Sequence, residues 1–316
     1  MANTTIYPYG LSGEIPAGLP VVNDLTTGGA NKALSAEQGK VLNGMINPGV
    51  DSSYTQGTYS GPRLTVKDSQ IFGIKMFGTK GANQQSMDAF GNTLVCMVNG
   101  STHYIYSISS NGSVVQLATF SASTGHSNSI QFAPFMESGQ DFPYLYVATL
   151  SKSCKVLSIT SAYAVSVVQT ISVDSSLIAA GSGDNTQIGD DGYIWTMFQE
   201  SDERYHFIKF RRVAVSEGDV TLTSADILDE WTTEKAYPYA TNVWQGMKIK
   251  DGRLWFVIGS TGGSQARCIL VFDTATHALV TTIDLATVNE EFENLCFWDD
   301  AVLVSAWSAN IYKLVL

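Results

Sequence analysis

The chain has 316 residues and a formal net charge of −11, and only 15 % of its residues are charged, well below the roughly one quarter of ordinary globular domains. Glycine and small polar residues replace the missing charge, which excludes a coiled-coil rod, a disordered chain and a charged helical repeat and favours short strands joined by polar turns. An acidic surface repels phosphate groups, so neither nucleic acid nor an anionic membrane is an expected partner.

Residues 1–61 form the first predicted region. Five of the eight prolines fall within the first 62 residues, together with many glycines and few strand signals. Such a segment is expected to be an extended arm that does not form a core of its own. It lacks the basic stretch and apolar run of a signal peptide, and no run in the chain is long enough to span a bilayer. We therefore expect synthesis in a cytoplasm, without membrane insertion.

One short helix is predicted inside this arm, over about residues 35–46. Ser35 followed by Gln38 fits a capping box, and Pro48 ends the helix. Several side chains are spaced three, four or seven residues apart and therefore lie on one face of this helix. They are Leu34, Gln38, Val41, Leu42 and Met45. A helix of about three turns is marginal alone in water. This face therefore needs a partner, either its own domain or copies of itself in a short bundle.

Residues 25–43, with the sequence LTTGGANKALSAEQGKVLN, resemble a segment that recurs near the N-termini of tail and fibre proteins of bacteriophages and prophages, notably those of Bacteroidales hosts. The resemblance covers about 20 of the 316 residues. It implies that the arm attaches to other virion proteins and often trimerises, while the distal part meets the host. We accordingly expect a virion protein that is assembled in the host cytoplasm, with a homotrimer formed through the helix.

A repeated unit follows from residue 63 onward. Each unit contains a polar pair, a short apolar strand, a tight turn and a stronger apolar strand, and the second strands start near residues 94, 144, 193, 253 and 301. A third strand follows in every unit and a fourth in several, although the fourth is poorly defined within residues 213–228 of the third unit. Four antiparallel strands in about 50 residues make a β-propeller blade. The fold predicted for residues 62–316 is therefore a single, mainly β propeller with five blades, or six if the longer third unit hides a degenerate blade.

The last unit ends directly after its third strand, at residues 311–315. Two apolar segments before the first unit, residues 63–66 and 71–77, have no role of their own. We expect one of these segments to supply the missing outer strand, so that the ring closes between residues 63–77 and the last blade. Closure of this kind removes exposed sheet edges, which otherwise invite aggregation.

Amides and hydroxyls align at the start of the innermost strand of each unit, where a propeller has one mouth of its central channel. The candidate ligand-binding residues at this mouth are Gln85, Ser86, Asn128, Gln187, Gln245, Glu293 and Asn294. Such groups donate and accept hydrogen bonds, as sugar binding requires, but they also satisfy channel waters and strand ends. Glycoside hydrolysis usually needs two carboxylates, and Glu293 is the one carboxylate among these residues, so no catalytic residue is predicted.

Aromatic residues gather in the connection before the fourth unit. They are Trp231, Tyr237, Tyr239 and Trp244. Aromatic rings on loops stack on sugars and anchor protein partners, although packing between blades explains them as well.

The remaining motifs favour structural roles. Residues 190–195, DDGYIW, partly resemble the aspartate box of sialidases but lack its leading serine and fall between the wrong strands, so a hairpin turn is predicted. The four cysteines and four histidines show neither CxxC nor zinc-site spacing, so buried thiols are expected and no metal or cofactor.

Three functions remain after these observations. The first is a phage tail or fibre protein, not an enzyme, whose propeller binds a glycan or protein of the host surface. The second is a purely structural virion protein that decorates or docks on the head or tail. The third is a carbohydrate-active enzyme, such as a sialidase-like hydrolase or lyase. The segment at residues 25–43 favours the first two.

Overall fold

The computed structural model describes residues 4–6, 12–14, 63–65, 71–74, 83–109, 114–178, 184–202, 204–233, 244–259, 267–285, 290–299 and 301–314. The chain divides into a small N-terminal unit and a large unit, Ser52–Val315. In the small unit, β1 (Thr4–Ile6) pairs antiparallel with β2 (Ser12–Glu14). The predicted helix over residues 35–46 lies outside the described residues. The described part of the large unit contains strands and the single-turn 3-10 helices η2 (Val215–Glu217) and η3 (Ser224–Asp226).

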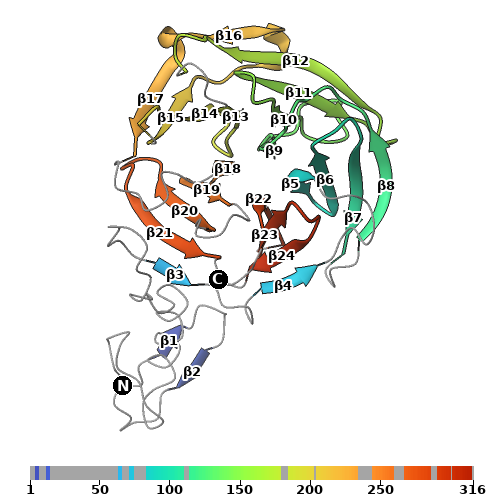
Figure 1. The fold of residues 1–316 in the computed structure, drawn as a ribbon. Coiled ribbons are helices and arrows are strands. Elements are labelled where there is room, and N and C mark those ends of the chain that lie inside the picture. Colours follow the sequence, from blue (N-terminus) through green and yellow to red (C-terminus); the bar gives the residue numbers. More distant parts are fainter. Residues whose placement is uncertain are drawn as a thin grey trace. The chain divides into compact units, whose positions relative to one another are not determined.

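The large unit is a five-bladed β-propeller, which confirms the predicted fold class and the lower blade count (Figure 1). The first blade consists of β5 (Gln84–Phe90), β6 (Thr93–Val98), β7 (His103–Ile108) and β8 (Val114–Phe120). The second consists of β9 (Ile130–Phe132), β10 (Leu145–Ala148), β11 (Ser153–Ile159) and β12 (Val165–Val173). The third consists of β13 (Asp184–Ile188), β14 (Ile194–Gln199), β15 (Tyr205–Phe210) and β17 (Ile227–Thr232).

The last two blades include strands from far earlier in the chain. The fourth blade consists of β18 (Trp244–Lys250), β19 (Arg253–Ile258), β20 (Cys268–Asp273) and β21 (Leu279–Asp284), followed in parallel by β3 (Arg63–Thr65). The fifth consists of β22 (Phe292–Trp298), β23 (Ala301–Ala306) and β24 (Ile311–Leu314), followed in antiparallel by β4 (Ile71–Ile74). A segment that precedes the first blade is therefore the outer strand of the last one.

The extra length of the third unit does not form a sixth blade. Between β15 and β17 the chain leaves the third blade, and β16 (Val220–Leu222) adds in parallel to the outer edge of β12 in the second blade. Arg211 stabilises the segment between β15 and β17, because its guanidinium contacts Glu217 at 2.9 Å and Asp226 at 2.8 Å. The main-chain N–H of Thr223 and the Arg211 guanidinium both lower the pKa of Asp226.

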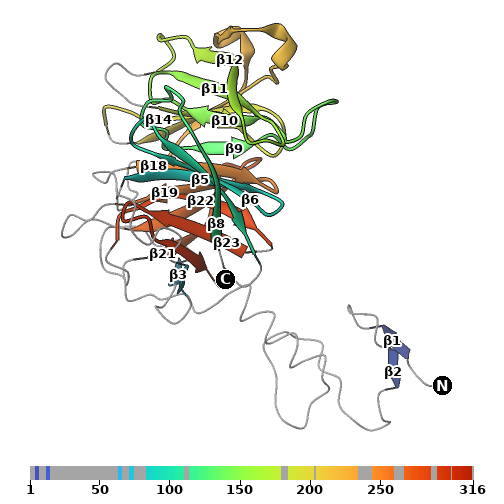
Figure 2. The same ribbon diagram turned by 90° about the vertical axis from the view of Figure 1, so that its right-hand side faces the viewer.

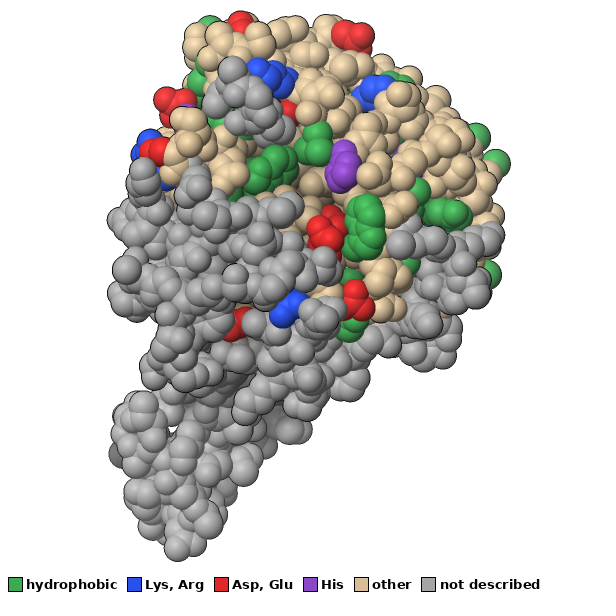
Figure 3. Space-filling view, viewed as in Figure 1, with side chains coloured by type: hydrophobic (Ala, Val, Ile, Leu, Met, Phe, Trp, Pro, Cys, Tyr) green, Lys and Arg blue, Asp and Glu red, His purple; other side chains and the backbone are tan. Residues whose placement is uncertain are grey.

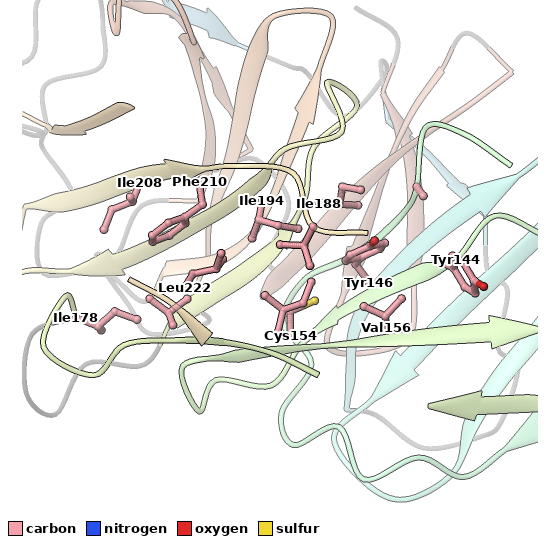
Figure 4. Packing of buried hydrophobic residues seen from close by; sticks show 14 of the residues in the cluster. Tyr144, Tyr146, Cys154, Val156, Ile178, Ile188, Ile194, Ile208, Phe210 and Leu222 are labelled. Carbon is pink, nitrogen blue, oxygen red and sulfur yellow. The ribbon is translucent and has the colours of Figure 1, made fainter. Parts of the chain in front are cut away.

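The core is divided into five hydrophobic clusters, one between each pair of neighbouring blades. Successive residues of a strand point to opposite faces, so each middle strand supplies both of its interfaces and reads as a continuous apolar run. In β6, for example, Leu94 and Cys96 pack toward the fifth blade while Val95 and Met97 pack toward the second. Figure 4 shows the cluster between the second and third blades, where Cys154 lies among aliphatic side chains. All four cysteines are buried thiols, as predicted.

The innermost strands β5, β9, β13, β18 and β22 surround the axis (Figures 1 and 2). We call the face of the propeller at which these strands begin the mouth face. Most of the described surface on this face is uncharged (Figure 3).

Candidate functional site on the mouth face

Three innermost strands contain a β-bulge at the same place, near the mouth face. The strand register shifts between Gln84 and Ser86 in β5, between Trp244 and Met247 in β18, and between Phe292 and Asn294 in β22. The extra residues at these bulges include Gln85, Gln245 and Glu293, which belong to the predicted mouth set. A bulge re-aims a side chain out of the regular alternation, here toward neighbouring blades around the axis.

The predicted mouth residues do come together around the axis, but they are buried. Each of the seven is at most 5 % exposed. Asn128 donates to Gln245 Oε1 at 3.1 Å, and Asn294 donates to the main-chain oxygen of Asn128 at 2.8 Å. Ser86 donates to the main-chain oxygen of Ser127 at 2.5 Å. Gln187 Nε2 donates to the main-chain oxygen of Met247 at 2.9 Å.

Gly246 allows the fourth blade to approach its neighbours at this level. A Cβ atom there would overlap the amide of Asn294 and come within 2.6 Å of the main-chain oxygen of Asn128. The second, fourth and fifth blades therefore meet directly around the Gln245–Gly246 peptide. Asn185 brings in the third blade, since its Nδ2 donates to the main-chain oxygen of Gln245 at 2.6 Å.

A buried ion pair lies further along the axis, and sequence reasoning missed it. Lys248 is 1 % exposed, and its Nζ lies 2.9 Å from Asp88 Oδ1 and donates to the main-chain oxygen of Ile130. Asp88 Oδ2 accepts from the main-chain N–H of Phe132 at 2.6 Å. The pair therefore links the first, second and fourth blades across the axis. The sequence feature that could have indicated this ion pair is a lysine between two apolar residues, Met247 and Ile249, of the innermost strand β18.

We call the buried mouth residues, with Asn185 and the neighbouring Glu291, the axial cluster. Its two carboxyl groups, Glu291 and Glu293, both have raised pKa values. Burial, together with the nearby Glu291, raises the pKa of Glu293 to about 9. Burial also raises the pKa of Glu291, which accepts from Gln245 Nε2 at 3.4 Å. Glu293 therefore carries its proton at neutral pH. Glu293 is 1 % exposed and enclosed by protein, so its carboxyl group cannot directly reach a glycosidic bond of a polysaccharide bound at the surface.

A cavity of about 460 Å³ opens elsewhere on the mouth face, between the β6–β7 turn and the connection from β8 to β9. It is lined by Asn99, Gly100, Ser101, Ser121, Ala122, Ser123, Thr124 and Gly125. We call it the serine pocket. Sequence reasoning did not find it, because its two walls are separate runs of small polar residues that resemble any loop.

His103 supports the wall of the serine pocket from inside the first blade. Its Nδ1 accepts from the main-chain N–H of Val98 at 3.3 Å, and its Nε2 lies 3.1 Å from the main-chain oxygen of Ala122. This arrangement requires a neutral ring with the proton on Nε2. Burial also lowers the pKa of His103, which keeps the ring neutral. Gly125 closes the wall against the next blade, where a Cβ atom would lie 2.5 Å from the main-chain oxygen of Thr149.

Two of the four aromatic candidates pack between blades. Trp231 stacks on Phe207 at 4.5 Å and on His277 at 5.2 Å between ring centroids, and His277 in turn bonds Asp229 at 2.8 Å. Trp244 is partly buried against the same cluster of the third and fourth blades. Tyr237 and Tyr239 lie outside the described residues.

The DDGYIW motif forms the turn between β13 and β14, as the hairpin interpretation predicts. Asp191 accepts from the main-chain N–H of Tyr193 at 3.1 Å and from Trp195 Nε1 at 3.3 Å, and it pairs with Lys209 at 2.8 Å. Its carboxylate is therefore occupied in holding the turn. Across the described ranges, no group of three or more His, Cys, Asp or Glu side chains is placed to hold a metal ion. No helix in those ranges is long and apolar enough to cross a membrane.

Comparisons with known proteins give one sequence match and several structural ones. The family model for phage tail fiber repeats matches residues 21–54, which include the segment discussed above. No curated protein matches the chain.

The similar solved structures share little sequence with this chain. Glutaminyl cyclase from Myxococcus xanthus is 10 % identical over 80 % of this chain and 97 % of its own, with a TM-score of 0.46. Virginiamycin B lyase from Staphylococcus aureus is 11 % identical over 78 % of this chain and 99 % of its own, with a TM-score of 0.42. The tail fiber of Staphylococcus aureus phage P68 is 12 % identical over 79 % of this chain and 52 % of its own, with a TM-score of 0.47. The chain thus joins a phage tail fiber repeat to a five-bladed β-propeller.

Proposed function

We propose that this protein is a bacteriophage virion appendage, a tail or fibre protein, whose propeller binds a glycan of the host surface. The observation that carries the proposal is the tail fiber repeat at residues 21–54, which precedes a propeller in the same chain. In this proposal residues 1–61 attach to other virion proteins, and the propeller is the distal, host-facing part.

The serine pocket is the part of the propeller that best suits a saccharide. Its side chains are uncharged hydroxyls and an amide, which offer the donors and acceptors that sugar hydroxyls need. Its volume of about 460 Å³ falls within the range of small-ligand sites. The axial residues are instead buried, and Asn128, Gln187 and Asn294 bond across blades, so we assign the axial residues to holding the blades together.

Binding rather than catalysis is the proposed role of the propeller. Glu291 and Glu293, two carboxylates near the mouth face, are the nearest resemblance to an acid–base pair, and Glu293 is 1 % exposed. The walls of the serine pocket contain hydroxyl, amide and glycine residues, which bind but do not supply the acid and base that glycoside hydrolysis uses.

Filling the serine pocket is expected to abolish binding to host cells. Ser121→Trp and Ser101→Trp place a bulky ring in the pocket at exposed positions, and each should weaken adsorption of the purified protein to host cells at least about tenfold. Ser161→Trp, on an exposed turn between β11 and β12 at the opposite face, is the matched control and should leave adsorption unchanged. A glycan array on the same proteins identifies the sugar.

Two results would contradict this assignment. Unchanged adsorption of both pocket variants would place the binding surface elsewhere. A wild-type protein that binds neither glycans nor cells would favour the alternative role of a structural decoration, and imaging of the parent particle would then distinguish head from tail attachment.

The apolar face predicted over residues 34–45 is proposed to make the protein a homotrimer. Val41→Asp combined with Met45→Asp places two charges on that face and should reduce the mass measured by light scattering about threefold, because a buried unpaired charge is strongly unfavourable. Lys40→Asp, outside this face, is the control and should keep the trimer. A monomeric wild-type protein, or a trimer that survives the double substitution, would contradict this role of the helix.

A further inference from the structure

Oxygen atoms without a partner gather in the axial cluster. Among the described residues, the buried oxygens with no hydrogen-bond donor nearby include Asn128 Oδ1, Asn185 Oδ1, Asn294 Oδ1 and Glu293 Oε2. These residues come from the second, third and fifth blades. Asn128 and Asn185 both donate to Gln245 of the fourth blade, and Asn294 donates to the main-chain oxygen of Asn128. Buried polar groups in native proteins are nearly always satisfied, so these oxygens are acceptors for a bound water molecule or cation.

The orientation of these amides is set by what their nitrogens bind. Asn185 Nδ2 donates to the main-chain oxygen of Gln245, and Asn294 Nδ2 donates to the main-chain oxygen of Asn128. A main-chain carbonyl only accepts, so turning either amide around would place two oxygens against each other. The same argument applies to Asn128, whose Nδ2 bonds Gln245 Oε1, because Gln245 Nε2 faces the Glu291 carboxylate. The three amide oxygens are therefore fixed as free acceptors.

We propose that the amide oxygens of Asn128, Asn185 and Asn294, together with the carboxyl group of Glu293, bind a hard cation of the calcium class on the propeller axis. Calcium takes six to eight oxygen ligands in flexible geometry, and amide and carboxylate oxygens are among them. Magnesium demands a rigid octahedron and is less suited to a site assembled from several blades. A cation there would tie the second, third and fifth blades together and would compensate the buried carboxylate.

Glu291 is a charged neighbour of Glu293 in this cluster. Glu290, on the same segment, is bound to Asn310 Nδ2 at 2.8 Å and to the Tyr312 hydroxyl at 3.0 Å, and the Lys248–Asp88 pair lies further along the axis.

The test measures cation binding to the full chain. After treatment with a chelator, millimolar Ca²⁺ should raise the melting temperature by about 5 °C, because a ligand that binds only the folded state stabilises it by mass action. Calorimetric titration with Ca²⁺ should give a saturable affinity at about one ion per chain. Glu293→Gln should weaken that affinity at least about tenfold.

Three controls make the result decisive. Glu290→Gln removes a carboxylate on the same face and should keep the full response to Ca²⁺. Ser121→Trp should keep it too, so failure of glycan binding and failure of cation binding are separate results. The proposal is overturned if the melting temperature is the same in chelator and in Ca²⁺, if NaCl at equal ionic strength has the same effect, or if Glu293→Gln responds like the wild type.

Discussion

Lys248→Met is expected to lower the free energy of unfolding of the propeller by about 3–5 kcal/mol, the usual cost of breaking a buried ion pair. Lys248 is 1 % exposed and its ammonium is bound to Asp88 and to the main-chain oxygen of Ile130. Methionine fills a similar volume but leaves a buried carboxylate without its cation. Urea unfolding followed by tryptophan fluorescence measures the loss. The m value, the slope of the unfolding free energy against urea concentration, should stay unchanged.

The matched control is Lys250→Met, two residues further along the same strand. The Lys250 side chain is 42 % exposed and lies 3.3 Å from Asp251, so its removal should cost less than about 1 kcal/mol. Adding Asp88→Asn to Lys248→Met should recover part of the loss, because asparagine is neutral and still accepts from the main-chain N–H of Phe132. A Lys248→Met protein as stable as the control would show that the ion pair does not hold the blades together.

The ion pair also shows what the sequence cannot supply. The five blades could be predicted because each blade is local: its strands follow one another, and the second strand recurs at spacings of 48 to 60 residues, near 94, 144, 193, 253 and 301. Asp88 and Lys248 are 160 positions apart and belong to blades that are not neighbours, so no local pattern connects them. Their proximity follows from closure of the ring, which brings all innermost strands to one axis.

Burial of the mouth residues was equally invisible in the sequence. Gln85, Gln245 and Glu293 were correctly placed at the starts of innermost strands, but their direction depends on bulges in the strand register. A bulge changes which side chain opposes which, and that is a property of the pair of strands. The sequence did not predict that the short strands β3 and β16 add in parallel to the fourth and second blades. Each has three residues, too few to show the alternation of apolar and polar residues that identifies a strand.

Glu293→Gln is expected to stabilise the cation-free protein at alkaline pH and to have little effect at acidic pH. In the unfolded chain the carboxyl group of Glu293 loses its proton near the ordinary value of 4.5, whereas in the folded protein burial raises the pKa to about 9. Between these values the folded state binds more protons than the unfolded state, so stability falls as the pH rises. Below about pH 4.5 both states are protonated and the group contributes nothing.

The size of this effect follows from the pKa difference, at about 1.4 kcal/mol for each unit. From about pH 4.5 to about pH 8 the wild type should lose on the order of 4 kcal/mol through this group, and the neutral glutamine variant should not. Urea unfolding in chelator at about pH 5 and about pH 8 measures the difference. Glu290→Gln is the control and should follow the wild type. Parallel pH curves for the wild type and Glu293→Gln would show that Glu293 titrates normally in the folded protein.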